Sequence, residues 1–118
     1  KKNMKKFLLL LHEDMEVFES LSPKEMEALA KSHFEWAQKL HEQGLLISGD
    51  GLEPSGILIK GKESTIKDGP YMESKEMIGG YYLLKAESIE EVVEIAKSCP
   101  CHHWGGTTEV RAIMDYEI

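Results

Sequence analysis

The chain has 118 residues, of which 42% are hydrophobic and 30% are charged, and its formal net charge is -7. This length suits one domain with a single core, so residues 1–118 are expected to form one domain, and the composition argues against disorder or a fibrous repeat. Acidic residues are spread along the chain without a basic stripe, which argues against nucleic acid as a partner.

Apolar runs and cysteines bear on the location of the protein. The longest apolar run, Phe7–Leu11, is far shorter than the roughly 20 residues of a membrane span, so no membrane partner is expected. The run is also too short for a signal peptide, and no small-residue cleavage site follows it. Only Pro100 separates Cys99 from Cys101, a spacing that would strain a disulfide. Free thiols in a reducing, cytoplasmic compartment are therefore expected.

The first half of the chain predicts a strand, a helix and a second strand. Residues 4–11 contain this apolar run, which does not alternate with polar residues and is typical of a central strand buried on both faces. Residues 22–25, Ser-Pro-Lys-Glu, form a capping box with proline in the first helical turn, and Gly44 marks the end of this helix. Residues 45–48 favour a strand, and residues 49–51, Gly-Asp-Gly, favour a turn after it.

The second half predicts a hairpin, a strand, a short helix and a final strand. The helix starts at a capping box, Ser88–Glu91, and ends before Pro100, because the residue before proline is pushed out of the helical region. The hairpin is predicted over 56–60 and 64–67, a turn over 68–70, and the two strands over 77–85 and 107–116.

This order of elements suits an α+β fold of the split β-α-β type, with an inserted hairpin. Its antiparallel sheet would have helices on one face only. The other face needs a cover, and a second copy of the chain is the simplest one. We therefore expect a homodimer.

Several motifs, in this order along the chain, resemble the DGPF-domain branch of the YCII-related family. They are Ser22–Met26, Gly44–Leu46, Gly49–Pro54, the turn Asp68–Tyr71, the strand Lys75–Tyr82 with its paired glycines and tyrosines, and Glu109–Arg111. Tyr71 stands where the branch name has Phe. The resemblance implies a ferredoxin-like domain that pairs through its open sheet face into a dimeric α/β barrel, with a cleft in each subunit. It also implies that members with enzymatic activity use a His and Asp pair, and that some members accompany sigma factors.

His33 is the first candidate for chemistry. At about 100° per residue it falls in the middle of the apolar stripe of the predicted helix. An imidazole held there can act as a general base or acid near neutral pH. The alternative is a core histidine satisfied by a backbone carbonyl or a carboxylate. His33 also matches the helix histidine of the wider family that the chain resembles, whereas His12 and His41 are expected at the rim or surface.

Asp50 is the expected carboxylate partner of His33. It lies between two glycines, just after the strand that follows the His33 helix. In the family that the chain resembles, the acid lies in this loop after the strand. The alternative is a plain turn in which Asp50 bonds its own backbone. Glu53 competes for the same role.

Four further residues are candidates for substrate contact. Glu109 and Arg111 share one strand face, where Arg111 could hold an anionic group of a substrate; the alternative is a cross-strand ion pair at a dimer interface. Tyr81 and its neighbour Tyr82 point to opposite faces, so one of them is expected to reach the cleft. Asp68 is the fourth candidate, although an Asp-Gly-Pro sequence first favours a turn.

No cofactor or metal site is predicted. Gly79-Gly80 lacks the GxGxxG pattern and is better explained by close packing across the sheet. Cys99–His103 holds four potential metal ligands that are too close together for a tetrahedral site. No Ser-His-Asp arrangement with a strand-to-helix elbow is present. Two functions stay open: a cofactor-free acid-base enzyme of lyase or isomerase type that acts on a small organic molecule through His33 and Asp50, and a non-catalytic ligand-binding or regulatory dimer.

Overall fold

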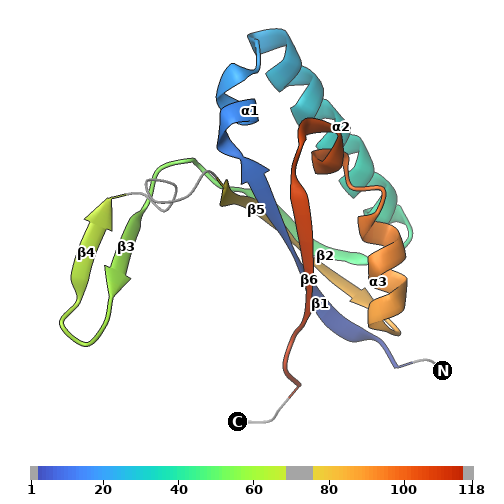
Figure 1. The fold of residues 1–118 in the computed structure, drawn as a ribbon. Helices are drawn as coiled ribbons and strands as arrows, with labels where there is room; N and C mark the ends of the chain where they lie inside the picture. Colours follow the sequence, from blue (N-terminus) through green and yellow to red (C-terminus); the bar gives the residue numbers. More distant parts are fainter. Residues whose placement is uncertain (1–2, 69–75, 116–118) are drawn as a thin grey trace.

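The computed structural model describes residues 3–68 and 76–115, and its strands form two antiparallel sheets (Figure 1). The main sheet has four strands in the order β2-β5-β1-β6, and β3 and β4 form the second sheet. The strands are β1 (Lys5–Asp14), β2 (Leu46–Gly51), β3 (Ile57–Lys60), β4 (Thr65–Asp68), β5 (Glu76–Ala86) and β6 (Thr107–Ala112). The helices are α1 (Met15–Ser20), α2 (Pro23–Glu42), α3 (Ile89–Ala96) and the 3-10 helix η2 (Pro100–Trp104). This confirms an α+β class with an antiparallel sheet and is compatible with a ferredoxin-like fold.

The predicted capping box fixes the start of α2. The Ser22 hydroxyl accepts a hydrogen bond from the Glu25 backbone N–H at 3.1 Å, and the Ser22 backbone N–H donates to the Glu25 carboxylate at 2.8 Å. Gly44 follows the helix with a φ of +76°, a conformation that glycine adopts at little cost. The predicted helix is thus confirmed. The short α1 was not predicted; Asp14 caps it by accepting from the Glu16 N–H at 3.0 Å.

The core lies between the helices and one face of the main sheet. Phe7, Leu9 and Leu11 of β1 are buried there together with Leu84 of β5 and Val92 of α3. The helices lie on this side of the sheet in Figure 1. Successive residues of a strand alternate between its faces, so the intervening positions of β1 belong to the opposite side.

We call that opposite side of the main sheet the open face. Leu8 and Leu10 of β1 lie on it, and Leu8 pairs with Leu83 of β5. All three are only half-buried in the single chain. The prediction that β1 is buried on both faces is therefore wrong for one chain by itself, because the described helices cover only the other face.

β6 is shorter than predicted. It ends at Ala112, which pairs with Phe7. Its partner β1 begins two residues before that point, at Lys5, so little of β1 is left to pair with residues beyond Ala112. The predicted range for this strand extended to residue 116, which lies outside the described residues.

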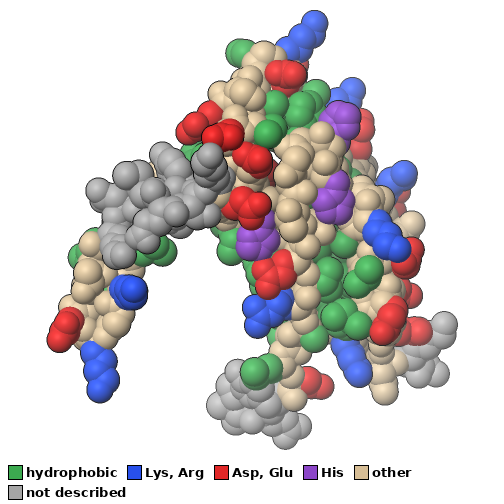
Figure 2. Space-filling view, in the orientation of Figure 1, with side chains coloured by type: hydrophobic (Ala, Val, Ile, Leu, Met, Phe, Trp, Pro, Cys, Tyr) green, Lys and Arg blue, Asp and Glu red, His purple; other side chains and the backbone are tan. Residues whose placement is uncertain are grey.

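The predicted hairpin is confirmed as the β3–β4 ribbon. It stands away from the main sheet in Figures 1 and 2. Ile59 pairs with Ile66, and Ile57 lies two residues from Ile59, so the three isoleucines share one face of the ribbon. Their side chains are 66% to 69% exposed. The ribbon therefore presents an apolar face that no described part of the chain covers.

Candidate functional site

A cavity of about 450 Å³ lies between α2 and the sheet, on the β2–β5 side. This volume is within the range of small-molecule sites. Its walls come from Phe18 of α1, from Leu29, His33 and Phe34 of α2, and from the ends of β1, β2 and β5. The predicted helix histidine therefore faces the sheet across this cavity.

His33 is half-buried and hydrogen-bonded at the edge of this cavity. Its Nδ1 lies 2.8 Å from the hydroxyl of Tyr82, and the two rings are stacked with an interplanar angle of 18°. Trp36, one turn further along α2, packs edge-on against the same Tyr82 ring and donates from its indole N–H to Ser98 at 2.9 Å. His33 is thus held by specific contacts and at the same time lines an open space.

The side of α2 that faces the sheet carries both leucines. Leu29 and Leu40 are buried, and Trp36 and Ala37 pack against the core. At about 100° per residue, His33 lies between Leu40 and Ala37 around the helix. It therefore falls within the stripe that faces the sheet, which is the position that the sequence pattern predicts.

Burial affects both partners of the His33–Tyr82 bond. It lowers the pKa of His33 below 6.5 and raises the pKa of Tyr82 above its ordinary value of 10, the charges of Cys99, Cys101 and Glu13 adding to the second effect. At neutral pH the pair is therefore a neutral imidazole and a protonated phenol. A neutral imidazole carries a single N–H, so the bond at Nδ1 leaves Nε2 as the nitrogen that can serve a ligand.

Glu13 is a cavity residue that the sequence reasoning missed. It follows Leu11 by two residues on β1, so both side chains point to the helix side of the sheet, and both line the cavity. Burial raises the pKa of the half-buried Glu13 carboxyl. A signal was present in the sequence: the odd-numbered positions of β1 run Phe7, Leu9, Leu11, Glu13, which places an acid in phase with the core.

A bulge in β5 makes room for Glu13. The register of β1 and β5 shifts between Leu11, which pairs with Gly80, and His12, which pairs with Ile78, so Gly79 has no partner on β1. A Cβ atom added to Gly79 would overlap the Glu13 side chain, with Oε2 only 2.8 Å away. Bulges recur next to functional sites, where they redirect side chains.

Gly80 meets a different constraint. A Cβ atom there would lie 3.0 Å from the backbone oxygen of Asp50 on the neighbouring β2. The glycine pair is therefore explained by close packing, as predicted.

Asp50 lines the same cavity, but its described hydrogen bond goes to another partner. The Tyr81 hydroxyl donates to the Asp50 carboxylate at 3.3 Å, and the two residues pair in the sheet. Because Tyr81 and Tyr82 alternate, this contact lies on the face opposite to the His33–Tyr82 bond. The pairing of Asp50 with His33 stays a prediction. The competing Glu53 is exposed and does not line the cavity.

Glu109 and Arg111 lie on the open face, away from the cavity walls. The His12 Nε2 atom lies 2.8 Å from the Glu109 carboxylate, and Arg111 donates to the same carboxylate at 3.4 Å. The hydrogen bond to His12, followed by the charges of His12 and Arg111, lowers the pKa of Glu109. These residues form a polar row beside Leu8 and Leu10, where a dimer interface was predicted.

Asp68 is the last residue of β4, in the separate ribbon. The rest of the predicted Asp68–Tyr71 turn lies outside the described residues.

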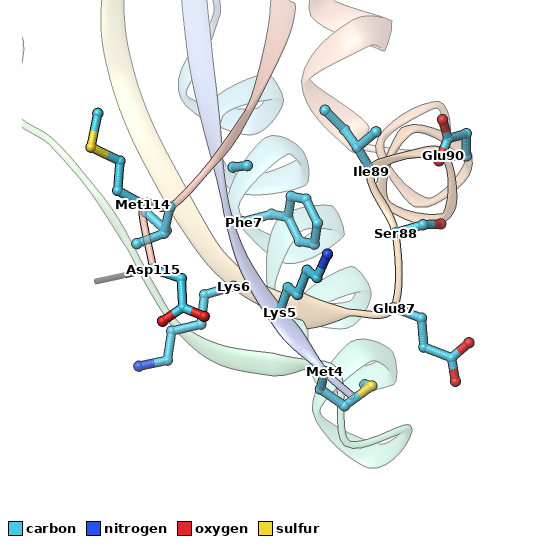
Figure 3. A pocket seen from close by; sticks show the side chains of 12 residues that line it. Met4, Lys5, Lys6, Phe7, Glu87, Ser88, Ile89, Glu90, Met114 and Asp115 are labelled. Carbon is cyan, nitrogen blue, oxygen red and sulfur yellow. The ribbon is translucent and has the colours of Figure 1, made fainter. Parts of the chain in front are cut away.

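A larger hollow of about 850 Å³ lies at the end of the sheet where β1 begins (Figure 3). Phe7 lies in its middle, between Met114 and Ile89, and the Glu87 carboxylate points away from it. None of the predicted site residues lines it. The candidate chemistry therefore belongs to the α2 cavity.

The Cys99–His103 segment has structural roles in the described chain. Cys99 and Cys101 are free and buried in the core, and their thiols are hydrogen-bonded to each other, which lowers the pKa of Cys99 and raises that of Cys101. His102 bonds the Thr108 hydroxyl at 3.0 Å. Over residues 3–68 and 76–115, no group of three or more His, Cys, Asp or Glu side chains is placed to hold a metal ion.

None of the helices in the described ranges combines the length and the apolar character that a membrane crossing requires.

Comparison with known proteins identifies the family of this fold. Among curated proteins, no relative matches the chain. The model of the YCII-related domain family matches residues 6–117, which is nearly the whole chain. The match spans every described helix and strand except the first residue of β1, and it includes both sides of the α2 cavity. The chain therefore belongs to the YCII-related family.

Proposed function

We propose that the α2 cavity binds a small organic molecule and that His33 transfers a proton to or from it. The observation that carries this proposal is the position of His33: it lines a cavity of about 450 Å³ while its Nδ1 is bonded to Tyr82. When the Nδ1–H donates to the Tyr82 oxygen, Nε2 carries the lone pair and is available as a base. No cofactor is part of the proposed reaction, which would be of the lyase or isomerase type.

A carboxyl group in the same cavity as the base is the second part of the proposal. Glu13 lies on the same side of the sheet as His33 and its charge acts on Tyr82, the residue that holds the His33 ring. It is our first choice for the acid that assists His33. The predicted partner, Asp50, would have to exchange its bond with Tyr81 for one with His33.

A homodimer formed through the open face is also proposed. Leu8, Leu10 and Leu83 give this face an apolar centre, and no described helix covers it. Glu109 and Arg111 then belong to the interface rather than to substrate binding. A cytoplasmic location is proposed from the two free thiols.

The second candidate function is a non-catalytic regulatory module that docks on another protein. The β3–β4 ribbon favours it, because Ile57, Ile59 and Ile66 present an apolar face to solvent. Exposed apolar surface of this kind is typical of interaction sites.

The two functions differ in whether a bound molecule exchanges protons with solvent. We would incubate the protein in D2O with two ring ketones, cyclohexanone and 4-piperidone, and follow loss of their α-protons by NMR. The enzyme proposal predicts faster exchange, with a loss of about a hundredfold or more in His33→Gln. His41→Gln, an exposed histidine on the same helix, is the control.

Two other results would count against catalysis. Equal exchange rates for the parent protein and His33→Gln would remove His33 as the base. Binding that shifts the His33 ring resonances without any exchange would favour the non-catalytic module.

A further inference from the structure

We propose that the molecule bound in the α2 cavity is an organic ammonium ion with an apolar ring or chain, and that the Glu13 carboxylate is its counter-charge. This inference rests on the proposed function and adds the chemical class of the ligand.

The charged residues of the cavity walls are acidic. Glu13 and Asp50 are the two acidic residues of the described lining, which contains neither Lys nor Arg. The Asp50 carboxylate is bonded to Tyr81 on the opposite face of the sheet, so Glu13 supplies the negative charge on the His33 side. Arg111, the residue predicted to hold an anionic group, instead bonds Glu109 on the open face. His33 is neutral because burial lowers its pKa. The described walls therefore repel an anion and attract a cation.

Glu13 lacks a partner among the described residues. Asp50 is already bonded to Tyr81, whereas the structure gives the Glu13 carboxyl no hydrogen bond or ion pair to any described residue. Gly79 leaves the room that this side chain occupies. Burial of an unpaired carboxylate costs free energy. A ligand ammonium supplies the missing partner.

Part of the cavity wall is aromatic. Phe18, Phe34 and Tyr82 line the same cavity as Glu13. The face of an aromatic ring attracts an ammonium group, and the ring also packs against an apolar ligand body. A carboxylate together with aromatic rings thus suits an amine with a hydrophobic part better than it suits a neutral or an anionic molecule.

Three probes of one shape test this proposal: benzylamine, benzyl alcohol and benzoate, which are cationic, neutral and anionic near neutral pH. Binding is followed by the chemical shifts of backbone amides and of the His33 ring. We expect benzylamine to bind most tightly and benzoate most weakly. In Glu13→Gln, which keeps the shape and removes the charge, benzylamine should lose about tenfold or more in affinity while benzyl alcohol is unchanged. Asp50→Asn is the matched control and should keep the benzylamine preference.

The remaining outcomes overturn the inference in different ways. Tightest binding by benzoate or benzyl alcohol would refute the ligand class while leaving the cavity as a binding site. Loss of the preference in Asp50→Asn but not in Glu13→Gln would refute the role of Glu13. If none of the three probes shifts a cavity resonance, the proposed binding function fails together with the inference. Unchanged circular dichroism confirms that each variant is folded.

Discussion

At the scale of single residues, three side chains define the chemistry of the cavity. They are His33 of α2, Tyr82 of β5 and Glu13 of β1. Burial shifts the pKa of each in the direction that favours its uncharged form. Perturbed titration of this kind is frequent at functional sites, although structural networks show it as well. The geometry adds what titration alone does not: all three groups face one cavity.

The pH dependence of stability follows from two of these shifts. The folded state lowers the pKa of His33 from 6.5, so the unfolded chain binds more protons below that value and the stabilising contribution of His33 is lost as the pH falls through the folded pKa. The folded state raises the pKa of Glu13 from 4.5, so its contribution is complete below 4.5 and is lost as the pH rises through the folded pKa.

We therefore expect His33→Gln and Glu13→Gln to change the pH profile of the unfolding free energy in opposite directions. From about pH 7 to about pH 5, the parent protein should lose stability relative to His33→Gln. From about pH 4 to about pH 7, it should lose stability relative to Glu13→Gln. Urea unfolding at several pH values measures both differences. Parallel profiles for the parent protein and both variants would show that neither group is perturbed by folding.

At the scale of elements, the close approach of β2 and β5 sets the shape of the cavity. A Cβ atom on Gly49 would lie 2.6 Å from the Tyr82 ring and 3.0 Å from the backbone oxygen of Tyr81. The ring has little freedom to move away, because His33 bonds its hydroxyl and Trp36 packs on its edge. The glycine of β2 thus allows the tyrosine of β5 to stay in place.

Gly49→Ala should consequently destabilise the protein by about 1–3 kcal/mol, the usual cost of overpacking. Gly51→Ala is the control on the same strand, since the nearest atom to its added Cβ is 4.0 Å away, and its effect should stay within about 0.5 kcal/mol. Urea denaturation followed by tryptophan fluorescence compares the two. Equal midpoints for both variants would mean that the Tyr82 ring is not confined as described.

At the scale of the whole molecule, the described part of the chain leaves two apolar surfaces uncovered. One is the open face with Leu8, Leu10 and Leu83, and the other is the isoleucine face of the β3–β4 ribbon. A two-stranded ribbon is marginally stable by itself in water. The dimer proposal assigns the first surface to a second copy of the chain.

Light scattering distinguishes the two surfaces. We expect a dimer at micromolar concentration, and we expect Leu10→Glu to yield a monomer because it places a charge in the centre of the proposed interface. Ile59→Glu on the ribbon should remain a dimer. Circular dichroism checks that both variants keep their fold. A monomeric parent protein, or a dimer disrupted by Ile59→Glu instead, would contradict assembly through the open face.

Much of the secondary structure of this protein could be predicted from the sequence alone, because it depends on neighbouring residues. The capping box at Ser22, the hairpin and the alternation of Glu109 with Val110 are short-range features, so the helix, the ribbon and the face of each side chain followed from neighbouring residues. The glycine pair was also attributed correctly to close packing. These features led to the α+β class and to the family.

Only the tertiary structure decided which residues meet. Packing of α2 on the sheet places His33 against Tyr82, and the bulge at Gly79 leaves room for Glu13 at the cavity, whereas Asp50 bonds Tyr81 on the other side of the sheet. A sequence fixes the alternation of a strand but not the register of its partner strand, and one unpaired residue changes which side chains meet. For this reason the helix histidine was predicted from the sequence, whereas the acid that lines the same cavity was not.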